Sequence, residues 1–188
     1  MALPVVPEAL LDRSERFDGR MLRLTVDTVR LGDGRSATRE VVHHPGGVAA
    51  VAIDTTGRVL LVRQYRHPAG DILWELPAGT REPAEPPEAT VRRELTEETG
   101  YAADTWQALG AAFLAPGYST ELLYFYLATG LRRVGEAAPD ADEAVEARFF
   151  DVGELAHLVA DGGLRDAKTL AGLALAGVPV AVIPAPVA

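Results

Sequence analysis

Three acidic side chains that lie close together on a predicted helix are the strongest chemical signal in this sequence. Glu94, Glu97 and Glu98 stand at i, i+3 and i+4, so a helix would place them on one face with Cβ atoms about 5–6 Å apart. No lysine lies nearby to neutralise these carboxylates. Hard divalent cations such as Mg²⁺ take oxygen ligands and commonly bind between carboxylates and substrate phosphates. A solvated acidic helix face is the alternative interpretation.

The residues around these carboxylates form a longer pattern. The segment from Gly79 to Tyr101, GTREPAEPPEATVRRELTEETGY, resembles the signature box of the Nudix hydrolase family, G-x5-E-x7-R-E-U-x-E-E-x-G-U, in which U is a bulky apolar residue. The fixed positions of this box are occupied by Gly79, Glu85, Arg93, Glu94, Leu95, Glu97, Glu98, Gly100 and Tyr101. Every spacing matches, so the resemblance is far more specific than a short glycine motif would be.

The resemblance implies a chemical role for the acidic residues. Nudix enzymes hydrolyse a diphosphate joined to a nucleoside, and bound Mg²⁺, or alternatively Mn²⁺, can act as Lewis acid, water activator and template. By the resemblance, Glu94, Glu98 and the carbonyl of Ala78 are metal ligands, and Glu97 assists through the metal or its water. The implied catalytic residues are Glu97, Glu98 and Glu143, the last matching a carboxylate that orients or deprotonates water. A solvated acidic loop is the other interpretation of the region around Glu143.

The remaining polar and glycine positions of the box are interpreted as structural. Arg93 is expected to pair with Glu85 and so hold the loop against the helix. Gly79 opens the box where the backbone is expected to approach the helix, and Gly100 is a natural helix stop.

Segments on both sides of the box narrow the resemblance to the ADP-ribose pyrophosphatases. They read VRQYRHPAGDILWELPAG before the box and FLAPGYSTE after it. The implied reaction is metal-dependent hydrolysis of the diphosphate of ADP-ribose to AMP and ribose 5-phosphate. The alternatives are another nucleoside diphosphate derivative (a sugar nucleotide, a dinucleotide or a flavin cofactor) and nucleotide sensing without catalysis. Sensors of this type commonly lose box carboxylates, whereas this chain keeps them all.

The same resemblance assigns substrate-binding residues outside the box. Arg66 is expected to contact the diphosphate, for which the planar guanidinium fork is well suited. Glu75 supports the site or caps its strand, and Pro116 marks the subgroup or is an ordinary turn proline. Arg39 and Glu40 match the position where relatives contact adenine, although Arg39 stands where some relatives have Trp or Tyr. An arginine can also stack on a base.

Alternating strands and helices around one core predict a mixed α/β (α+β) fold. The resemblance implies the Nudix fold, a mixed β-sheet between helices, with a small N-terminal antiparallel strand extension. Residues 1–45 are expected to form that extension, for dimerisation and the substrate pocket, and residues 46–188 the hydrolase domain. Strands are predicted over 20–30, 36–44, 47–53, 58–64, 71–76, 105–114, 122–129 and 147–151, helices over 87–99, 152–160 and 167–176, and a poorly constrained lead over 1–15. Relatives exchange N-terminal strands in homodimers, so a homodimer is expected.

Composition limits the partners and the location. The 188 residues carry a net charge of −9, which argues against non-specific nucleic-acid binding, because such binding relies on basic patches. Cysteine is absent, which fits a reducing compartment, and a cytoplasmic location is predicted. The uncharged run over 169–188 is broken by Pro179, Pro184 and Pro186, so it is interpreted as a packed helix and a tail rather than a membrane span.

Overall fold

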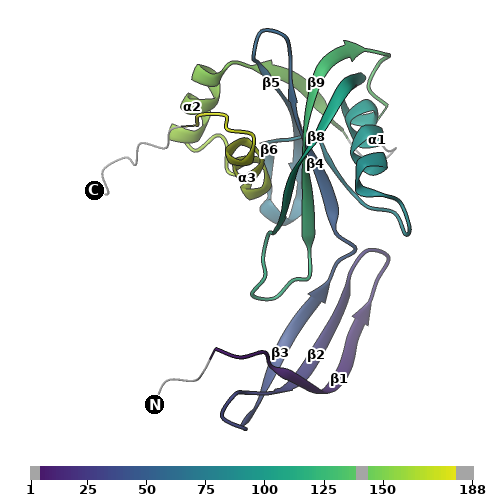
Figure 1. Ribbon diagram of the computed structural model, residues 1–188, viewed down its shortest axis with the longest axis vertical. Helices are drawn as coiled ribbons and strands as arrows, with labels where there is room; N and C mark the ends of the chain where they lie inside the picture. Colours follow the sequence, from purple (N-terminus) through teal and green to yellow (C-terminus); the bar gives the residue numbers. More distant parts are fainter. Residues whose placement is uncertain (1–4, 139–143, 181–188) are drawn as a thin grey trace. The chain divides into compact units, whose positions relative to one another are not determined.

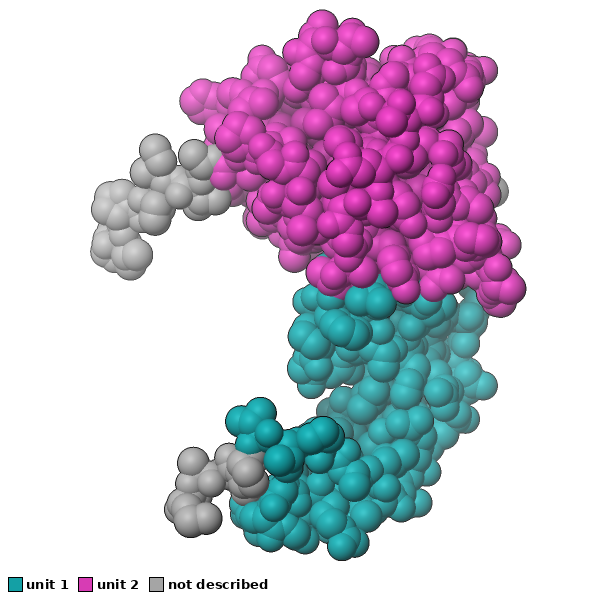
Figure 2. Space-filling view, in the orientation of Figure 1, with its two compact units in different colours: residues 1–46, 113–122 teal, residues 47–112, 123–188 magenta. Residues whose placement is uncertain are grey.

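The computed structural model describes residues 5–138 and 144–180 of the chain. The protein folds as two compact units (Figure 2). Unit 1 comprises residues 1–46 and 113–122, and unit 2 comprises residues 47–112 and 123–188. A segment from much later in the sequence therefore joins the N-terminal strands.

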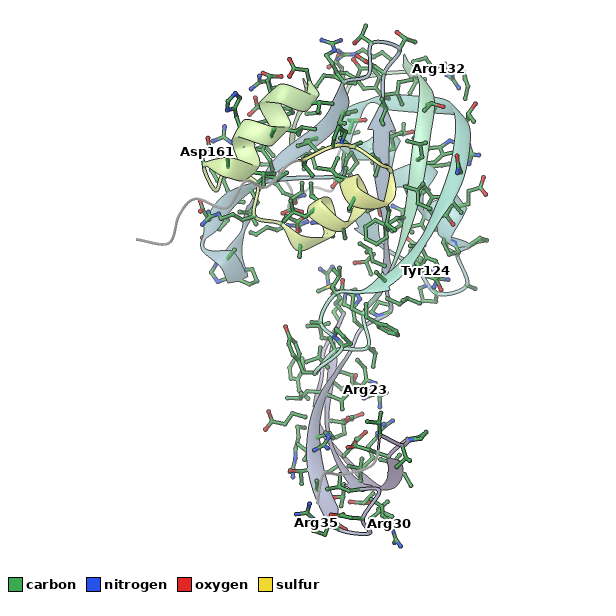
Figure 3. All side chains as sticks on the ribbon, turned by 60° about the vertical axis from the view of Figure 1, so that its left-hand side comes forward. Arg23, Arg30, Arg35, Tyr124, Arg132 and Asp161 are labelled. Carbon is green, nitrogen blue, oxygen red and sulfur yellow. The ribbon has the colours of Figure 1, made fainter. Side chains whose placement is uncertain are left out.

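Unit 1 is built on a three-stranded antiparallel sheet in the order β1-β2-β3. Its strands are β1 (Ala9–Asp18), β2 (Arg23–Arg30) and β3 (Ser36–His43). The side chains of Arg30 and Arg35 stand at the turn between β2 and β3 (Figure 3).

The prediction of a poorly constrained lead over residues 1–15 is wrong for residues 9–15, because β1 begins at Ala9. Every residue of β1 except Ser14 is exposed. The strand therefore needs no alternation of apolar and polar residues, which is the sequence pattern that indicates a half-buried strand. The strand forms because its backbone pairs with β2 along its length. The guanidinium of Arg13 in β1 also donates two hydrogen bonds to the carboxylate of Asp27 in β2, with N–O distances of 2.8 and 2.6 Å.

Segment 113–122 extends this sheet at β3. Val42 donates its N–H to the carbonyl of Tyr118 at 2.8 Å and accepts the N–H of Thr120 at 2.9 Å. The segment thus pairs with β3 as a short parallel bridge centred on Ser119. Two of its backbone polar groups, the Tyr118 carbonyl and the Thr120 N–H, are thus satisfied by β3.

Unit 2 contains a mixed sheet with helices on both faces, which confirms the predicted fold class (Figure 1). The strand order is β10-β5-β4-β9-β8, with β6 beside β5 and β7 beside β4. Strand β4 runs parallel to β9 and antiparallel to β5. The strands are β4 (Gly47–Ile53), β5 (Val59–Arg66), β6 (Asp71–Glu75), β7 (Ala78–Thr80), β8 (Tyr101–Phe113), β9 (Leu122–Arg133) and β10 (Glu146–Phe150).

The helices of unit 2 lie in two layers. Helix α1 (Pro87–Thr99) covers one face of the sheet, and α2 (Val152–Ala160) and α3 (Ala167–Leu175) cover the other (Figure 1). A one-turn 3₁₀ helix, η1 (His67–Ala69), joins β5 to β6. No helix within residues 5–138 and 144–180 has the length and apolar character needed to cross a bilayer.

A split between the two central strands makes room for the chain that leads into the box. Strands β4 and β5 pair only near Ala52 and Ile53 and then separate. Beyond that point β6 pairs with β5 and β7 pairs with β4. The chain crosses between them through Leu76 and Pro77, where the N–H of Ala50 donates to the Pro77 carbonyl at 2.8 Å. The residues just before the box are thereby brought beside α1.

Helix α1 has the predicted bounds because both of its ends carry local signals. Pro87 stands in the first turn, where a missing N–H costs little. Gly100 ends the helix with φ 73° and donates its N–H to Thr96 at 2.8 Å, a conformation that favours glycine. Val91 and Leu95, one turn apart, are fully buried in a core shared with β4. The packing of this apolar side sets the direction in which the box carboxylates point.

Replacement of Leu95 by Ala is expected to lower the free energy of unfolding by about 2–5 kcal/mol, because it leaves a cavity between α1 and the sheet. Leu95 is 0% exposed. The measurement is urea unfolding followed by circular dichroism. The matched control is Leu175→Ala at the end of α3, where the residue is 45% exposed. Equal losses in the two variants would show that α1 is not anchored through this side chain.

Candidate active site

The backbone of β7 lies directly against the carboxylates of α1. The N–H of Ala78 donates to Oε2 of Glu98 at 3.0 Å, and Glu98 is only 3% exposed. A Cβ atom added to Gly79 would lie 2.0 Å from the carboxylate carbon of Glu94, so only a glycine leaves room for that side chain. The loop and the helix of the box therefore meet at the two carboxylates predicted to bind metal.

The carbonyl of Ala78 faces the same side as these carboxylates. In an extended strand, the N–H and C=O of one residue point to the same side, and successive residues alternate. The N–H of Ala78 points at Glu98, whereas the carbonyl of Pro77 points at β4, where it accepts from Ala50. The Ala78 oxygen is thus directed away from β4, as a backbone ligand on the α1 side requires.

Arg93, which was predicted only to pair with Glu85, also supplies positive charge beside two further carboxylates of the box. Its Nη1 lies 2.9 Å from Oε1 of Glu94 and 2.8 Å from Oε2 of Glu97. Its Nη2 lies 3.2 Å from Oε2 of Glu85, so the predicted pair between loop and helix is present. The hydrogen bond to Glu85, despite partial burial, raises the pKa of Arg93 above its ordinary value.

The oxygen donors around β7 and α1 suit a hard divalent cation. Glu94 and Glu98, with the Ala78 carbonyl, would hold such an ion, since carboxylate and carbonyl oxygens are the preferred ligands of Mg²⁺. In the described part of the chain, no three His, Asp or Glu side chains converge on one point, and Arg93 bridges Glu94 and Glu97. The donor chemistry therefore fits a divalent cation, with Arg93 in contact with Oε1 of Glu94 beside it.

A buried ionic network adjoins the crossing between β6 and β7. Arg66 forks onto Glu75, from Nε to Oε1 at 2.9 Å and from Nη2 to Oε2 at 2.8 Å. Nζ of Lys168 donates to the same Oε2 and also to Asp166, the latter at 3.0 Å. Burial would raise the pKa of Glu75, but the hydrogen bond from Arg66 and the charge of Lys168 outweigh it and lower that pKa. Glu75 is therefore an ionised carboxylate that is 1% exposed.

Sequence reasoning missed Lys168 and Asp166 as members of this network. One signal was available: Lys168 is the only lysine of the chain, and it lies in the first turn of α3, where a positive charge opposes the helix dipole. An unfavourably placed cation indicates a specific partner. The partner could not be named from sequence, because Glu75 lies 93 residues away.

The other predicted site residues lie in unit 1 or outside the described residues. Arg39 and Glu40 lie on β3 of unit 1, where Arg39 donates to Glu8. Pro116 lies in an exposed turn of unit 1. Glu143 lies outside the described residues. Unit 2 thus brings together the box residues with Arg66 and Glu75, and the adenine-contact assignments stay predictions.

The fold and the carboxylate arrangement of unit 2 are those of one known class of protein. The family profile described as NUDIX domain matches residues 43–173, so the chain belongs to the NUDIX family. A solved structure titled "Crystal structure of ADP compounds hydrolase" superposes with a TM-score of 0.80 and covers 94% of this chain and 95% of its own. At 18% sequence identity this likeness concerns the fold alone.

Closer relatives share most of the length of the chain. An ADP-ribose pyrophosphatase of Mycobacterium tuberculosis is 45% identical over 157 residues, which cover 82% of this chain and 76% of that protein. A methanol dehydrogenase activator of Bacillus methanolicus is 36% identical over 164 residues, covering 87% and 89% of the two chains. An ADP-ribose pyrophosphatase of Bacillus subtilis is 36% identical over 163 residues, covering 86% and 88%.

Proposed function

We propose that this protein is a metal-dependent ADP-ribose pyrophosphatase that converts ADP-ribose and water to AMP and ribose 5-phosphate. The observation that carries the proposal is the seating of Glu94 and Glu98 against the backbone of Ala78 and Gly79. This arrangement puts two carboxylates and a carbonyl on one side of α1, as phosphate-bound Mg²⁺ or Mn²⁺ requires. The relatives in Mycobacterium and Bacillus that bear this name support the choice of substrate.

Different residues of unit 2 have different roles in the proposed hydrolysis. A divalent cation held by Glu94, Glu98 and Ala78 would neutralise diphosphate charge and lower the pKa of water. Arg66 binds diphosphate oxygens through the edge of its guanidinium that does not face Glu75. Glu97, with a side chain 42% exposed, would assist through the metal or its bound water. Water adds to one phosphorus, the bond from that phosphorus to the bridging oxygen breaks, and the two monophosphates leave.

Hydrolysis of ADP-ribose in H₂¹⁸O, with Mg²⁺ or with a chelator, tests this proposal. We expect AMP and ribose 5-phosphate only in the presence of the ion, with ¹⁸O in one product, which also identifies the phosphorus attacked. A panel of a sugar nucleotide, a dinucleotide and a flavin cofactor provides the comparison. A higher kcat/KM for a panel member would reassign the substrate. Tight nucleotide binding without turnover of any compound would favour a sensor.

Glu143 is the carboxylate we propose as the group that orients or deprotonates water. Replacement by Gln keeps the shape and removes the charge, so turnover of ADP-ribose is expected to fall by about 10²–10⁴-fold while its binding persists. The matched control is Glu136→Gln, an exposed carboxylate paired with Arg133. Single-turnover kinetics and a binding titration separate the two effects. Wild-type turnover in the Glu143 variant would remove this residue from the mechanism.

We also propose a homodimer formed through unit 1, in a protein located in the cytoplasm. A three-stranded sheet is close to the minimum for independent stability, and unit 1 exposes large apolar side chains. These are Val5, Val6, Leu10, Leu11, Phe17, Met21, Phe113 and Tyr118. Contact with a second copy would remove apolar side chains of this kind from water, which favours association.

The dimer proposal predicts that charges on β1 dissociate the protein. In sedimentation equilibrium the wild type is expected to have the mass of two chains, and the double variant Leu10→Glu with Leu11→Glu the mass of one, because each charge would be desolvated in the interface. Val134→Glu, at an exposed apolar position of unit 2, is the control and should stay dimeric. A monomeric wild type would contradict the proposal.

A further inference from the structure

One buried carboxylate of unit 2 is shared by two cations that come from different elements. Glu75, at the end of β6, accepts from Arg66 of β5 and from Lys168 of α3. Its Oε1 accepts a hydrogen bond from Nε of Arg66, and its Oε2 accepts hydrogen bonds from Nη2 of Arg66 and from Nζ of Lys168. A carboxylate that is 1% exposed needs such partners, because an unpaired buried charge is strongly destabilising.

The first turn of α3 is bonded to the same stretch of chain. Oδ2 of Asp166 accepts the N–H and the hydroxyl of Thr169, at 3.0 and 2.6 Å, as well as Nζ of Lys168. The hydroxyl of Thr169 in turn accepts the N–H of Leu76 at 2.8 Å. Consecutive residues before the box, Glu75 and Leu76, are thus both held by α3. Lys168 is therefore fixed in place: its side chain is 12% exposed and has two acceptors.

The fork on Glu75 determines which edge of the Arg66 guanidinium is offered to a ligand. Two of the five N–H donors of an arginine are used in the fork, and they lie on one edge. The terminal edge of the guanidinium keeps donors on Nη1 and on the second hydrogen of Nη2, in the geometry that binds two oxygens of a phosphate. Arg66 is partly open, with a side chain 39% exposed, so this edge can reach a ligand.

We propose that Lys168 is a positioning residue for the diphosphate: by sharing Glu75 with Arg66, it fixes the orientation in which Arg66 meets the substrate phosphates. The inference rests on the proposed function, since it takes Arg66 as a diphosphate contact. Lys168 itself touches Glu75 and Asp166 and acts on the substrate only through Arg66. Without Lys168, the carboxylates of Glu75 and Asp166 would both attract the guanidinium of Arg66. We expect this guanidinium to turn toward them and to bind substrate anions more weakly.

Binding of inorganic pyrophosphate, measured by calorimetry, tests the role without requiring turnover. Lys168→Met is expected to bind pyrophosphate about tenfold more weakly than the wild type, the size typical for loss of a group that orients a ligand-binding residue. In ADP-ribose hydrolysis the same variant should raise KM by a similar factor, with kcat changed by less than about threefold. Lys168→Arg, which keeps the charge, should recover most of the affinity.

The control is Arg165→Met, which removes a cation three residues away on the same segment. Arg165 pairs with Asp71 at the surface, and its side chain is 58% exposed, so its loss should change pyrophosphate affinity by less than about twofold. Equal affinities for Lys168→Met and Arg165→Met would overturn the inference. Absence of pyrophosphate binding by the wild type would also overturn it. A wild type that binds pyrophosphate but hydrolyses no ADP-ribose would refute the proposed function alone.

A double-mutant cycle with Glu75→Gln separates positioning from general stabilisation. Because Lys168 acts through Glu75, adding Lys168→Met to Glu75→Gln is expected to change pyrophosphate affinity by less than about twofold. This double variant removes one charge of each sign, so it is expected to fold even where Lys168→Met alone does not, since neutral replacement of a buried pair is commonly tolerated. Losses that multiply in the double variant would show that Lys168 acts independently of Glu75.

Discussion

Replacement of Glu98 by Gln is expected to lower kcat for ADP-ribose by about 10²–10³-fold, with little change in thermal stability. Gln keeps an oxygen that can accept the N–H of Ala78, so the contact between β7 and α1 survives. What is lost is the negative charge that would hold a divalent cation beside the diphosphate. Removal of one preorganised electrostatic contribution to a transition state typically costs this much.

Two measurements check the expectation for Glu98. Steady-state hydrolysis gives the loss in kcat, and a Mn²⁺ titration followed by electron paramagnetic resonance gives the loss in ion affinity. The matched control is Glu88→Gln, a carboxylate on the same helix that pairs with Arg92 and has a side chain 55% exposed. The control should keep wild-type turnover. A Glu98 variant with full kcat and unchanged Mn²⁺ affinity would end the assignment of Glu98 as a metal ligand.

Replacement of Gly79 by Ala is expected to reduce turnover about 100-fold while leaving the free energy of unfolding nearly unchanged. The new Cβ would lie 2.0 Å from the carboxylate of Glu94, so one of the two must move. Gly79 is paired with Val48 of the central strand β4, whereas the Glu94 carboxylate ends a flexible side chain. Glu94 is therefore the group that gives way, and small displacements at a reacting centre are costly.

The separation of activity from stability distinguishes this explanation from simple unfolding. Thermal unfolding and kcat are measured on Gly79→Ala beside Gly135→Ala, because a Cβ on Gly135 would meet nothing within 4 Å. The control should match the wild type in both measurements. Retention of full turnover by Gly79→Ala would show that Glu94 does not need the position it has in the structure.

The bounds of the box helix could be predicted from residues at its own two ends. Its bounds, Pro87–Thr99, agree with the sequence prediction residue for residue, because proline at the start and glycine at the end act on their own turns. Strand β4 was also predicted with its observed bounds, since a fully apolar run of this length is typical of a buried central strand. By contrast, β8 begins at Tyr101, earlier than the predicted residue 105, because Ala102, Ala103 and Asp104 have low strand propensity.

The sequence by itself determined the family, the mixed α/β class and the candidate metal-binding carboxylates, because spacing within one helix depends only on neighbouring residues. Tertiary structure decided which groups meet: β1 with β2, Arg93 with Glu94, and Lys168 with Glu75. The last contact joins residues 93 positions apart. Contacts of that kind arise when burial of apolar faces brings separate elements together, and no local pattern encodes which polar side chains will then be neighbours.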